Sequence, residues 1–357
     1  MRSYRVVVIP GDGIGPEIVE SALRVLSTVQ GTPRSFEVQL DYHKGGARCF
    51  QETGHALPPQ TLEACRQADA VMKGPAGLPE VRNPDGTEAG LLGGVLRNGL
   101  DTYANVRPVR LWPSVDAPTR FKPGQVDYVI VRENTEGLYA SRGLGVSNRW
   151  AASDILFMTR PGVERVSRFA FELARKRKGS PRDGVRRVTC VDKSNVLKSF
   201  WFFRQVFDEV GADYPDVQKD YLYSDAAAQA LVMDPSRFDV LVMENFLGDL
   251  LSDLGGGTTG GIGLCPSGNY GDKYSYFEPV HGSAPTLAGQ GRANPVAQVL
   301  SLALMLQHLN EADAAERVNR AVWQAFASGA LAIGGDGCPA GGTRAATDAI
   351  LKNIGAA

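Results

Sequence analysis

Short runs of apolar residues alternate along the chain with longer segments in which apolar residues recur every three or four positions. A β-branched run from Arg5 to Ile9 precedes an amphipathic segment from about Pro16 to Thr28, and residues 36–42 then alternate between apolar and polar. A second helical pattern runs from Leu57 to Ala68, and Ala70 to Met72 form a further apolar run. This order of strands and helices predicts a largely parallel sheet covered by helices.

The rest of the chain continues the alternation. Short apolar runs that end in a polar residue predict strands at 128–132, 188–192 and 240–244, and the Gly-, Pro- and charge-rich segment 74–94 predicts a loop. No shift in composition marks a linker, so we expect any second domain to be an insertion that the chain leaves and re-enters. Further helices are predicted over about residues 162–178, 293–309, 313–327 and 343–354.

Composition and charge narrow the class of protein. The chain has 357 residues and a net charge of −1, which argues against a polyanion as the main partner. Its apolar stretches are shorter than the ~18 residues that span a bilayer, and the run from Val6 to Ile9 is too short for a signal peptide, so we expect a cytoplasmic protein. The five cysteines form no CxxC pair and predict free thiols, with neither a zinc site nor a disulfide framework.

Two aspartates stand four residues apart in the segment Asn245-Phe-Leu-Gly-Asp249-Leu-Leu-Ser-Asp253-Leu. In a helix this spacing puts both carboxylates on one face, one turn apart, where their like charges repel. A hard divalent cation with oxygen ligands, Mg²⁺ or Mn²⁺, would neutralise them. A solvated acidic face on an amphipathic helix is the alternative, and the spacing by itself leaves both open.

Several basic residues lie in polar segments next to predicted strands. Arg132 follows one strand, and Arg97 and Arg107 lie in a second polar stretch. Because the guanidinium fork matches two carboxylate oxygens, the three suggest an anionic substrate with more than one carboxylate. Lys193 follows another strand and would serve as a base if a neighbouring cation lowered its pKa. For all four residues, a plain surface position is the alternative.

The segment Gly11–Glu17 follows the first strand and opens a helix, but it matches neither the GxGxxG nor the GxxxxGK[ST] pattern, and a tight turn is the plainer interpretation. Taken together in their order, the polar segments of the chain resemble the β-decarboxylating dehydrogenases, a family that includes isopropylmalate, isocitrate, homoisocitrate and tartrate or D-malate dehydrogenases. The segments that carry the resemblance are 11–17, 103–108, 132–139, 192–196, 248–263, 277–285 and 293–295.

The resemblance implies a two-domain isopropylmalate/isocitrate dehydrogenase-like α/β fold, distinct from the Rossmann fold, with a mixed sheet flanked by helices. It implies a dinucleotide-binding domain formed by residues 1–101 plus 255–357. Residues 102–254 would then be an inserted domain that carries the dimer interface and the metal ligands. A homodimer with a shared active site and a small-molecule substrate is expected, with no nucleic acid and no membrane as partner.

The resemblance also implies a role for each matching residue. Arginines clamp the malate carboxylates, and aspartates bind Mg²⁺ or Mn²⁺. Lys193 of the partner subunit helps to remove the hydroxyl proton as hydride leaves for the nicotinamide, and Tyr139 protonates the enolate after CO₂ is lost. The implied sets are Arg97, Arg107 and Arg132 for substrate; Asp249, Asp253 and the partner subunit's Asp225 for the metal; Tyr139, Lys193 and Asp225 for catalysis; and His281, Gly282, Ser283, Ala284, Pro285, Asn294, Arg292 and Arg344 for the dinucleotide.

Two departures from the family pattern concern specificity. The NAD-type pattern has an acid after Ala-Pro, where this chain has Thr286, and the chain adds Arg292 and Arg344, which favours the ribose 2′-phosphate of NADP over NAD. In the family, the positions three, four and six before the first arginine contact the variable group of the substrate. Here they hold Gly94, Gly93 and Leu91, which favours a 3-substituted or unsubstituted malate. Isocitrate or homoisocitrate is the alternative substrate. A non-catalytic regulatory subunit and a nucleotide-binding module without redox activity are the alternative classes.

Overall fold

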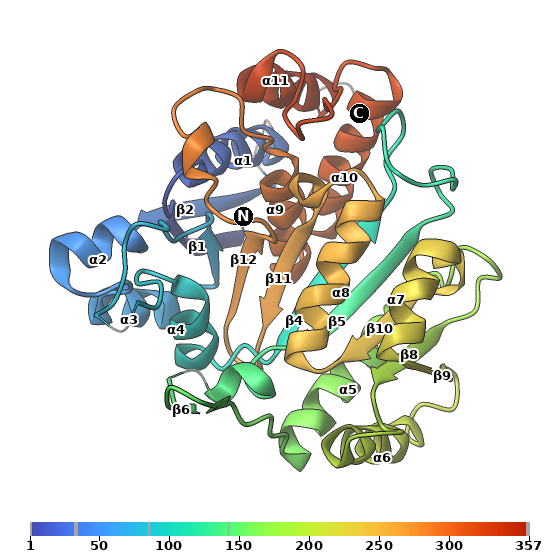
Figure 1. Cartoon of the computed structure of the whole chain (residues 1–357). Coiled ribbons are helices and arrows are strands. Elements are labelled where there is room, and N and C mark those ends of the chain that lie inside the picture. Colours follow the sequence, from blue (N-terminus) through green and yellow to red (C-terminus); the bar gives the residue numbers. More distant parts are fainter. Residues whose placement is uncertain (1, 32–34, 85, 142, 355–357) are drawn as a thin grey trace. The chain divides into compact units, whose positions relative to one another are not determined.

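The computed structural model describes residues 2–31, 35–84, 86–141 and 143–354. The chain divides into two compact units, whose elements are labelled in Figure 1. The terminal unit contains the chain up to Thr102, Trp112–Ala117 and the chain from Gly260 onward, and the inserted unit contains Tyr103–Leu111 and Pro118–Thr259. Both ends of the sequence thus contribute to one unit, and the central part forms the other.

The terminal unit is built on a mixed sheet with the strand order β2-β1-β3-β12-β11. β1 is parallel to β2 and β3, and β12 is parallel to β3 but antiparallel to β11. In β1, Val6 and Val8 pack into one hydrophobic cluster and Val7 and Ile9 into another, because successive side chains point to opposite faces. Both faces are covered, which explains the continuous apolar run. The strands are β1 Arg2–Ile9, β2 Phe36–Tyr42, β3 Ala70–Lys73, β11 Pro266–Tyr270 and β12 Ser275–Pro279.

Helices cover both faces of this sheet. α1, α9, α10 and α11 contribute to the larger cluster, with α1 packed against α9 and α11, whereas α3 and α4 contribute to the smaller one. Prolines in the first turn of α1 and α3 favour helix initiation because their φ is already helical. The helices are α1 Gly15–Val29, α2 Ala47–Thr53, α3 Pro59–Gln67, α4 Leu92–Gly99, α9 Val296–His308, α10 Ala312–Ala327 and α11 Gly342–Ile354.

The inserted unit also contains both parallel and antiparallel strand pairs, in the strand order β4-β5-β10-β8-β9. β4 and β5 are antiparallel, and the remaining pairs are parallel. α5 packs against α6 and the strands β5, β8 and β10, whereas α8 packs against α7, β4 and β5. The elements are β4 Ala104–Arg110, β5 Asp127–Glu133, β8 Arg187–Asp192, β9 Gln218–Tyr223, β10 Val240–Met243, α5 Arg160–Lys176, α6 Lys198–Gly211, α7 Ser224–Met233 and α8 Asn245–Thr258, with a short hairpin of β6 Val146–Ser147 and β7 Ala152–Ser153.

The expected α/β class with a mixed sheet flanked by helices is confirmed, but the prediction of a largely parallel sheet is wrong at two pairs. β11 pairs antiparallel with β12, and β4 pairs antiparallel with β5. Of these four strands, the sequence predicts only β5. The predicted loop 74–94 extends too far, because α4 begins at Leu92, where Gly93 and Gly94 weaken the helical pattern. The sequence also does not predict α2, α6, α7 and β9.

The cysteines agree with their prediction, since all five are buried and free. Within the described ranges, no helix combines the length and the hydropathy that a membrane span requires.

Candidate functional site

Arg132 lies at the centre of a polar cluster in the inserted unit. β5 carries it into the interior, where its side chain is only 1 % exposed. Its Nε and Nη2 donate to Oδ1 of Asn245 at 2.9 and 2.7 Å, and its Nη1 pairs with Asp249. A guanidinium group buried to this degree requires such partners, because an unpaired buried charge is strongly unfavourable.

Arg107 reaches the same carboxylate from β4. Its Nε donates to Oδ1 of Asn105 at 2.6 Å, and its Nη1 donates to Oγ of Ser252 at 2.6 Å. Nη1 also lies 3.2 Å from Oδ1 of Asp249 and 3.5 Å from Oδ1 of Asp253. Two of the three predicted arginines therefore face the two predicted aspartates, in an arrangement that suits a ligand with several carboxylates.

Helix α8 presents the two aspartates one turn apart, as the spacing predicts. The carboxylate of Glu244 accepts a hydrogen bond from the N–H of Leu247 at 3.1 Å and thereby caps the start of this helix. Gly248 lies against β5, and a Cβ added there would be 2.6 Å from Cβ and Cγ of Arg132. The glycine allows the close approach that brings Asp249 to the arginine.

Tyr139 points its hydroxyl at the same aspartate. It lies in a short 3₁₀ helix, Leu138–Ser141, and its Oη donates to Oδ2 of Asp249 at 3.0 Å. Its ring packs edge-on against Phe246, and the Arg132 guanidinium lies 5.6 Å from the ring centroid. A phenolic proton donor is therefore held beside the arginines and the carboxylates.

The donor set of this cluster suits a divalent cation. Burial raises the pKa of Asp253, Arg107 lowers it in part, and the like charge of Asp249 raises it again, so that the net pKa lies above the usual value. A dication would relieve this repulsion, and carboxylate oxygens are the ligands that Mg²⁺ and Mn²⁺ prefer. Among the described residues, however, no three His, Cys, Asp or Glu side chains gather at one point. Asp249 and Asp253 are the acidic pair that this cluster supplies.

Lys193 and Asp225 form a pair of their own. Lys193 follows β8, Asp225 lies in the first turn of α7, and Nζ is 2.5 Å from Oδ1 of the aspartate. Hydrogen bonding to Lys193 lowers the pKa of the Asp225 carboxyl. Although α7 packs against α8, Asp225 does not join Asp249 and Asp253 in the described part of this chain. The single chain therefore leaves the predicted catalytic residues in two groups.

The glycine-rich turn after β1 is fixed by its own acid. The buried carboxylate of Asp12 accepts hydrogen bonds from the N–H groups of Ala47 and Gly77 at 2.7 and 2.8 Å. Gly13 has a positive φ of 58°, and a Cβ there would overlap the carbonyl oxygen of Ser283. The plainer interpretation of this segment, a tight turn, describes its structure, and the turn rests directly on the predicted dinucleotide loop.

In that loop, from His281 to Pro285, the backbone is open at Gly282. Gly282 has nothing within 4 Å of the place where a Cβ would stand, and Ala284 adopts a positive φ of 38°. Burial lowers the pKa of His281, so its imidazole is neutral near pH 7. Its Nε2 is buried and has no hydrogen-bond partner among the described residues. An orphaned buried nitrogen beside an open backbone fits a polar ligand such as a dinucleotide.

The remaining predicted dinucleotide residues differ in whether their side chains are free to contact a ligand or are already paired within the chain. Asn294 is buried, and its Oδ1 accepts the first N–H of α9 at 3.1 Å. Arg292 is already paired with Asp336 at 2.7 Å. Arg344 is 91 % exposed, with its Nε 3.9 Å from Asp348, and it lines a cavity of about 440 Å³. Of the two predicted cations, Arg344 is the one whose charge is weakly compensated.

Arg97, the third predicted arginine, lies in the terminal unit on α4. A Cβ added at Gly93, one turn earlier, would be 3.8 Å from Cζ of Arg97. A Cβ at position 93 would therefore touch this guanidinium group in ordinary van der Waals contact, and the glycine places no side chain there.

Three polar residues that hold the arginines were not singled out from the sequence. Asn105 precedes Arg107 by two residues, and Ser252 follows Asp249 by three, so strand and helix periodicity would have found both once an arginine and an aspartate were chosen. Asn245 meets an arginine 113 residues away and carries no local signal.

Comparisons with known proteins agree on one family. The family model described as isocitrate/isopropylmalate dehydrogenase matches residues 5–350. The 3-isopropylmalate dehydrogenases of Clavibacter sepedonicus and Aquifex aeolicus are 44 % and 38 % identical, each over 99 % of this chain and 98 % of theirs. The crystal structure of isocitrate dehydrogenase from Methylococcus capsulatus is similar with a TM-score of 0.86 and 37 % identity, and covers 98 % of this chain and 99 % of its own.

Proposed function

Since the chain belongs to the isocitrate/isopropylmalate dehydrogenase family, we propose that it catalyses the metal-dependent oxidative decarboxylation of a malate-type 2-hydroxy acid, with NAD or NADP as hydride acceptor. The proposed substrate is 3-isopropylmalate or a related 3-substituted malate, tartrate or D-malate. The observation that carries the proposal is the convergence of Arg107 and Arg132 on Asp249, with Asp253 and the Tyr139 hydroxyl beside them.

The arginines bind and orient the substrate. Asn245 accepts hydrogen bonds from the guanidinium group of Arg132, and Asn105 accepts one from that of Arg107, so each guanidinium plane is fixed. In both arginines Nη1 is then directed at the aspartates. Fixed donors orient a dicarboxylate without the entropy loss of ordering a mobile side chain. Arg97 of the terminal unit is proposed as the third clamp.

Asp249 and Asp253, joined by Asp225 of a second copy, are proposed as the ligands of Mg²⁺ or Mn²⁺. When bound, the cation supplies Lewis-acid polarisation of the substrate oxygens. Lys193 of the second copy is proposed as the base: its ammonium group, now paired with Asp225, would first release a proton to solvent, and the neutral Nζ would then accept the proton of the substrate hydroxyl. Tyr139 donates its Oη proton to the carbon that has lost CO₂.

A homodimer is proposed because the inserted unit carries both halves of this site without joining them and leaves apolar side chains exposed. Trp150, Trp201 and Met233 are examples on its hairpin, α6 and α7. Exposed apolar surface of this kind is typical of subunit interfaces.

The terminal unit is proposed as the dinucleotide-binding domain (1–101 plus 255–357) and the inserted unit as the metal- and dimer-forming domain (102–254). The dinucleotide would lie along His281–Pro285 and Asn294. We propose NADP as the preferred form, held by Arg344 rather than by Arg292, which Asp336 occupies. The Arg344→Ala variant would then lose at least about tenfold in kcat/KM with NADP but not with NAD. Comparable kcat/KM values for NAD and NADP in the unmodified protein would remove this preference.

A substrate panel tests the proposed reaction. 3-Isopropylmalate, D-malate, tartrate, isocitrate and homoisocitrate are offered with Mg²⁺ or Mn²⁺ and with each dinucleotide, and reduction is followed at 340 nm. We expect a malate-type substrate to react best, because Gly93 offers no side chain to pair with a third carboxylate. Isocitrate turning over tenfold faster than the others would support the alternative substrate. No metal-dependent reduction with any compound would favour a regulatory subunit or a binding module. A cytoplasmic location remains a prediction from the sequence.

A further inference from the structure

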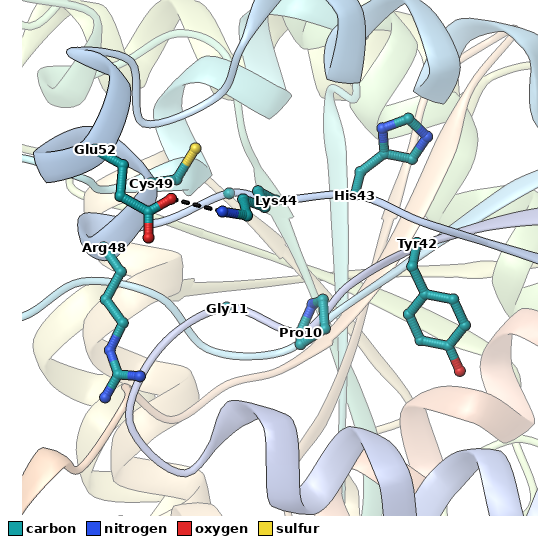
Figure 2. Close-up of a pocket in the computed structure, with 9 residues that line it drawn as sticks. Pro10, Gly11, Tyr42, His43, Lys44, Arg48, Cys49 and Glu52 are labelled. Atoms are coloured by element: carbon teal, nitrogen blue, oxygen red, sulfur yellow. Dashed lines mark hydrogen bonds and ion pairs between the residues drawn. The ribbon is translucent and has the colours of Figure 1, made fainter.

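A cavity of about 350 Å³ lies in the terminal unit, where the parallel strands β1 and β2 end (Figure 2). Its lining includes Pro10, Gly11, Tyr42, Lys44, Arg48 and Glu52. Its volume is within the usual range for small-molecule sites, and the carboxyl ends of parallel strands are where α/β sheets commonly bind ligands. Apart from Gly11, which belongs to the turn after β1, none of these residues has a role in the proposed reaction.

Arg48 supplies an uncompensated positive charge at this cavity. Its guanidinium group makes no ion pair or hydrogen bond within the described ranges, although its backbone N–H donates to Asp12 at 3.1 Å. The Lys44 ammonium is paired locally, since its Nζ is 2.7 Å from Glu52, and Nε2 of His43 lies 3.1 Å from Oδ1 of Asp41. The five N–H donors of Arg48 are therefore available to an anion.

The opposite side of the cavity is aromatic. Tyr42 is 60 % exposed, which is unusual for a large ring, and no ring contact orders it within the described ranges. Figure 2 shows Tyr42 and Arg48 on opposite sides of Pro10 and Gly11. A molecule that lies across the proline ring would place a flat apolar body toward Tyr42 and its charged group toward Arg48.

The walls of this cavity are fixed before any ligand arrives. The carboxylate of Asp12 accepts N–H groups from Ala47 and Arg48 and thereby ties the start of α2 to the turn after β1. Gly46 lies against that carboxylate so closely that a Cβ would overlap it. A preformed wall lowers the entropic cost of binding.

We propose that this cavity is a second ligand site, which binds a small organic anion with a flat ring: a phosphate ester or a carboxylate. The anion pairs with Arg48, and the ring packs between Pro10 and Tyr42. The proposal is independent of the proposed reaction, because binding is measurable without turnover.

Isothermal titration calorimetry with phenyl phosphate, benzoate, inorganic phosphate and phenol tests the site, on full-length protein saturated with dinucleotide. We expect phenyl phosphate or benzoate to bind more tightly than either inorganic phosphate or phenol, because only they carry both groups. The tighter of the two identifies the anion as a phosphate or a carboxylate. The Arg48→Ala variant should weaken binding at least about tenfold, and Arg48→Lys should weaken it less.

Arg320→Ala is the matched control, since Arg320 is an exposed arginine on α10 of the same unit. It should leave the affinity unchanged, and far-ultraviolet circular dichroism should show that each variant is folded. Equal affinities of the unmodified protein and Arg48→Ala would overturn the proposal. So would the absence of saturable binding of both ring-bearing anions up to about 10 mM.

Discussion

The two units of the chain differ in how many large apolar side chains they leave exposed. Among the described residues, four large exposed apolar side chains belong to the terminal unit and thirteen to the inserted unit. The terminal unit buries its apolar residues between a sheet and helices on both faces. The four are Leu40, Tyr42, Val95 and Ile262, and the thirteen are Tyr139, Leu144, Val146, Trp150, Ile155, Phe157, Val196, Leu197, Trp201, Tyr223, Val232, Met233 and Leu250.

The same contrast holds for the polar sites. In the terminal unit, the turn after β1 and the loop at Ser283 already contact each other within one chain. Among the described residues of the inserted unit, no third acidic side chain joins Asp249 and Asp253, and the Lys193–Asp225 pair lies apart from them. The proposed homodimer would account for this difference, because a second copy would cover the exposed apolar surface of the inserted unit and join the two groups of its site.

The largest expected effect comes from removing a carboxylate of the inserted unit. Asp253→Asn should lower kcat/KM about a thousandfold, because a bound dication contributes several kcal/mol to transition-state stabilisation. Steady-state kinetics over a range of Mg²⁺ and Mn²⁺ concentrations measures the loss. Glu316→Gln, which alters an exposed acid on α10 of the terminal unit, is the control and should have no effect. A loss below tenfold for Asp253→Asn would remove this residue from the metal site.

The second effect concerns the exposed surface itself. Trp150, 81 % exposed, should be buried in the dimer, so Trp150→Glu should raise the dimer dissociation constant by about a hundredfold or more. The equivalent change in the terminal unit, Leu40→Glu, should leave assembly unchanged. Sedimentation equilibrium of both variants decides the matter. If both variants dissociate equally, the exposed apolar side chains of the inserted unit do not mark the dimer interface.

The third effect tests the close approach of α8 to β5. Gly248→Ala would place a methyl group 2.6 Å from Arg132, and overpacking of this kind destabilises by about 1–3 kcal/mol. Gly257 lies in the same helix with nothing within 4 Å, so Gly257→Ala should stabilise by about 0.5–1 kcal/mol through helix propensity. Urea unfolding gives both values. The same sign for the two variants would contradict the packing described here.

The smallest effect concerns pH. Burial raises the pKa of Asp127, but Arg110 and Arg177 outweigh this, and the net pKa is lowered. A lowered folded-state pKa contributes stability that is present above the unfolded value of about 4 and is lost as the pH falls through the folded value. Asp127→Asn should therefore destabilise by under about 1 kcal/mol at pH 7, with the difference vanishing on acidification. A difference that grows as the pH falls would reverse this assignment.

Sequence reasoning succeeded where one local period decides the structure. The alternation in 36–42 gives β2 its bounds, and the four-residue spacing of Asp249 and Asp253 predicts their common helical face. It failed where contacts between segments distant in the sequence determine the structure. The antiparallel pairing of β4 with β5 and of β11 with β12 depends on topology, and α4 contains three glycines, Gly93, Gly94 and Gly99, which disfavour a helix.

For the candidate site, too, local patterns predicted some residues, whereas contacts between distant segments were not predictable. Residue types and family resemblance selected the arginines and aspartates, but Asn245 joins Arg132 across 113 residues and was invisible in the sequence. Arg292 also illustrates the limit, because its pairing with Asp336 depends on two loops that lie 44 residues apart.

Mixing two inactive variants tests the central claim, that a second copy completes the site of the inserted unit. Lys193→Ala and Asp253→Asn each remove one half of the site and should be inactive alone. After exchange of subunits, a mixed dimer has one intact site and one doubly defective site. With random pairing, the mixture should recover roughly a quarter of the unmodified activity. A mixture that exchanges subunits but stays inactive would show that Lys193 and Asp253 act within one chain, and would contradict the account.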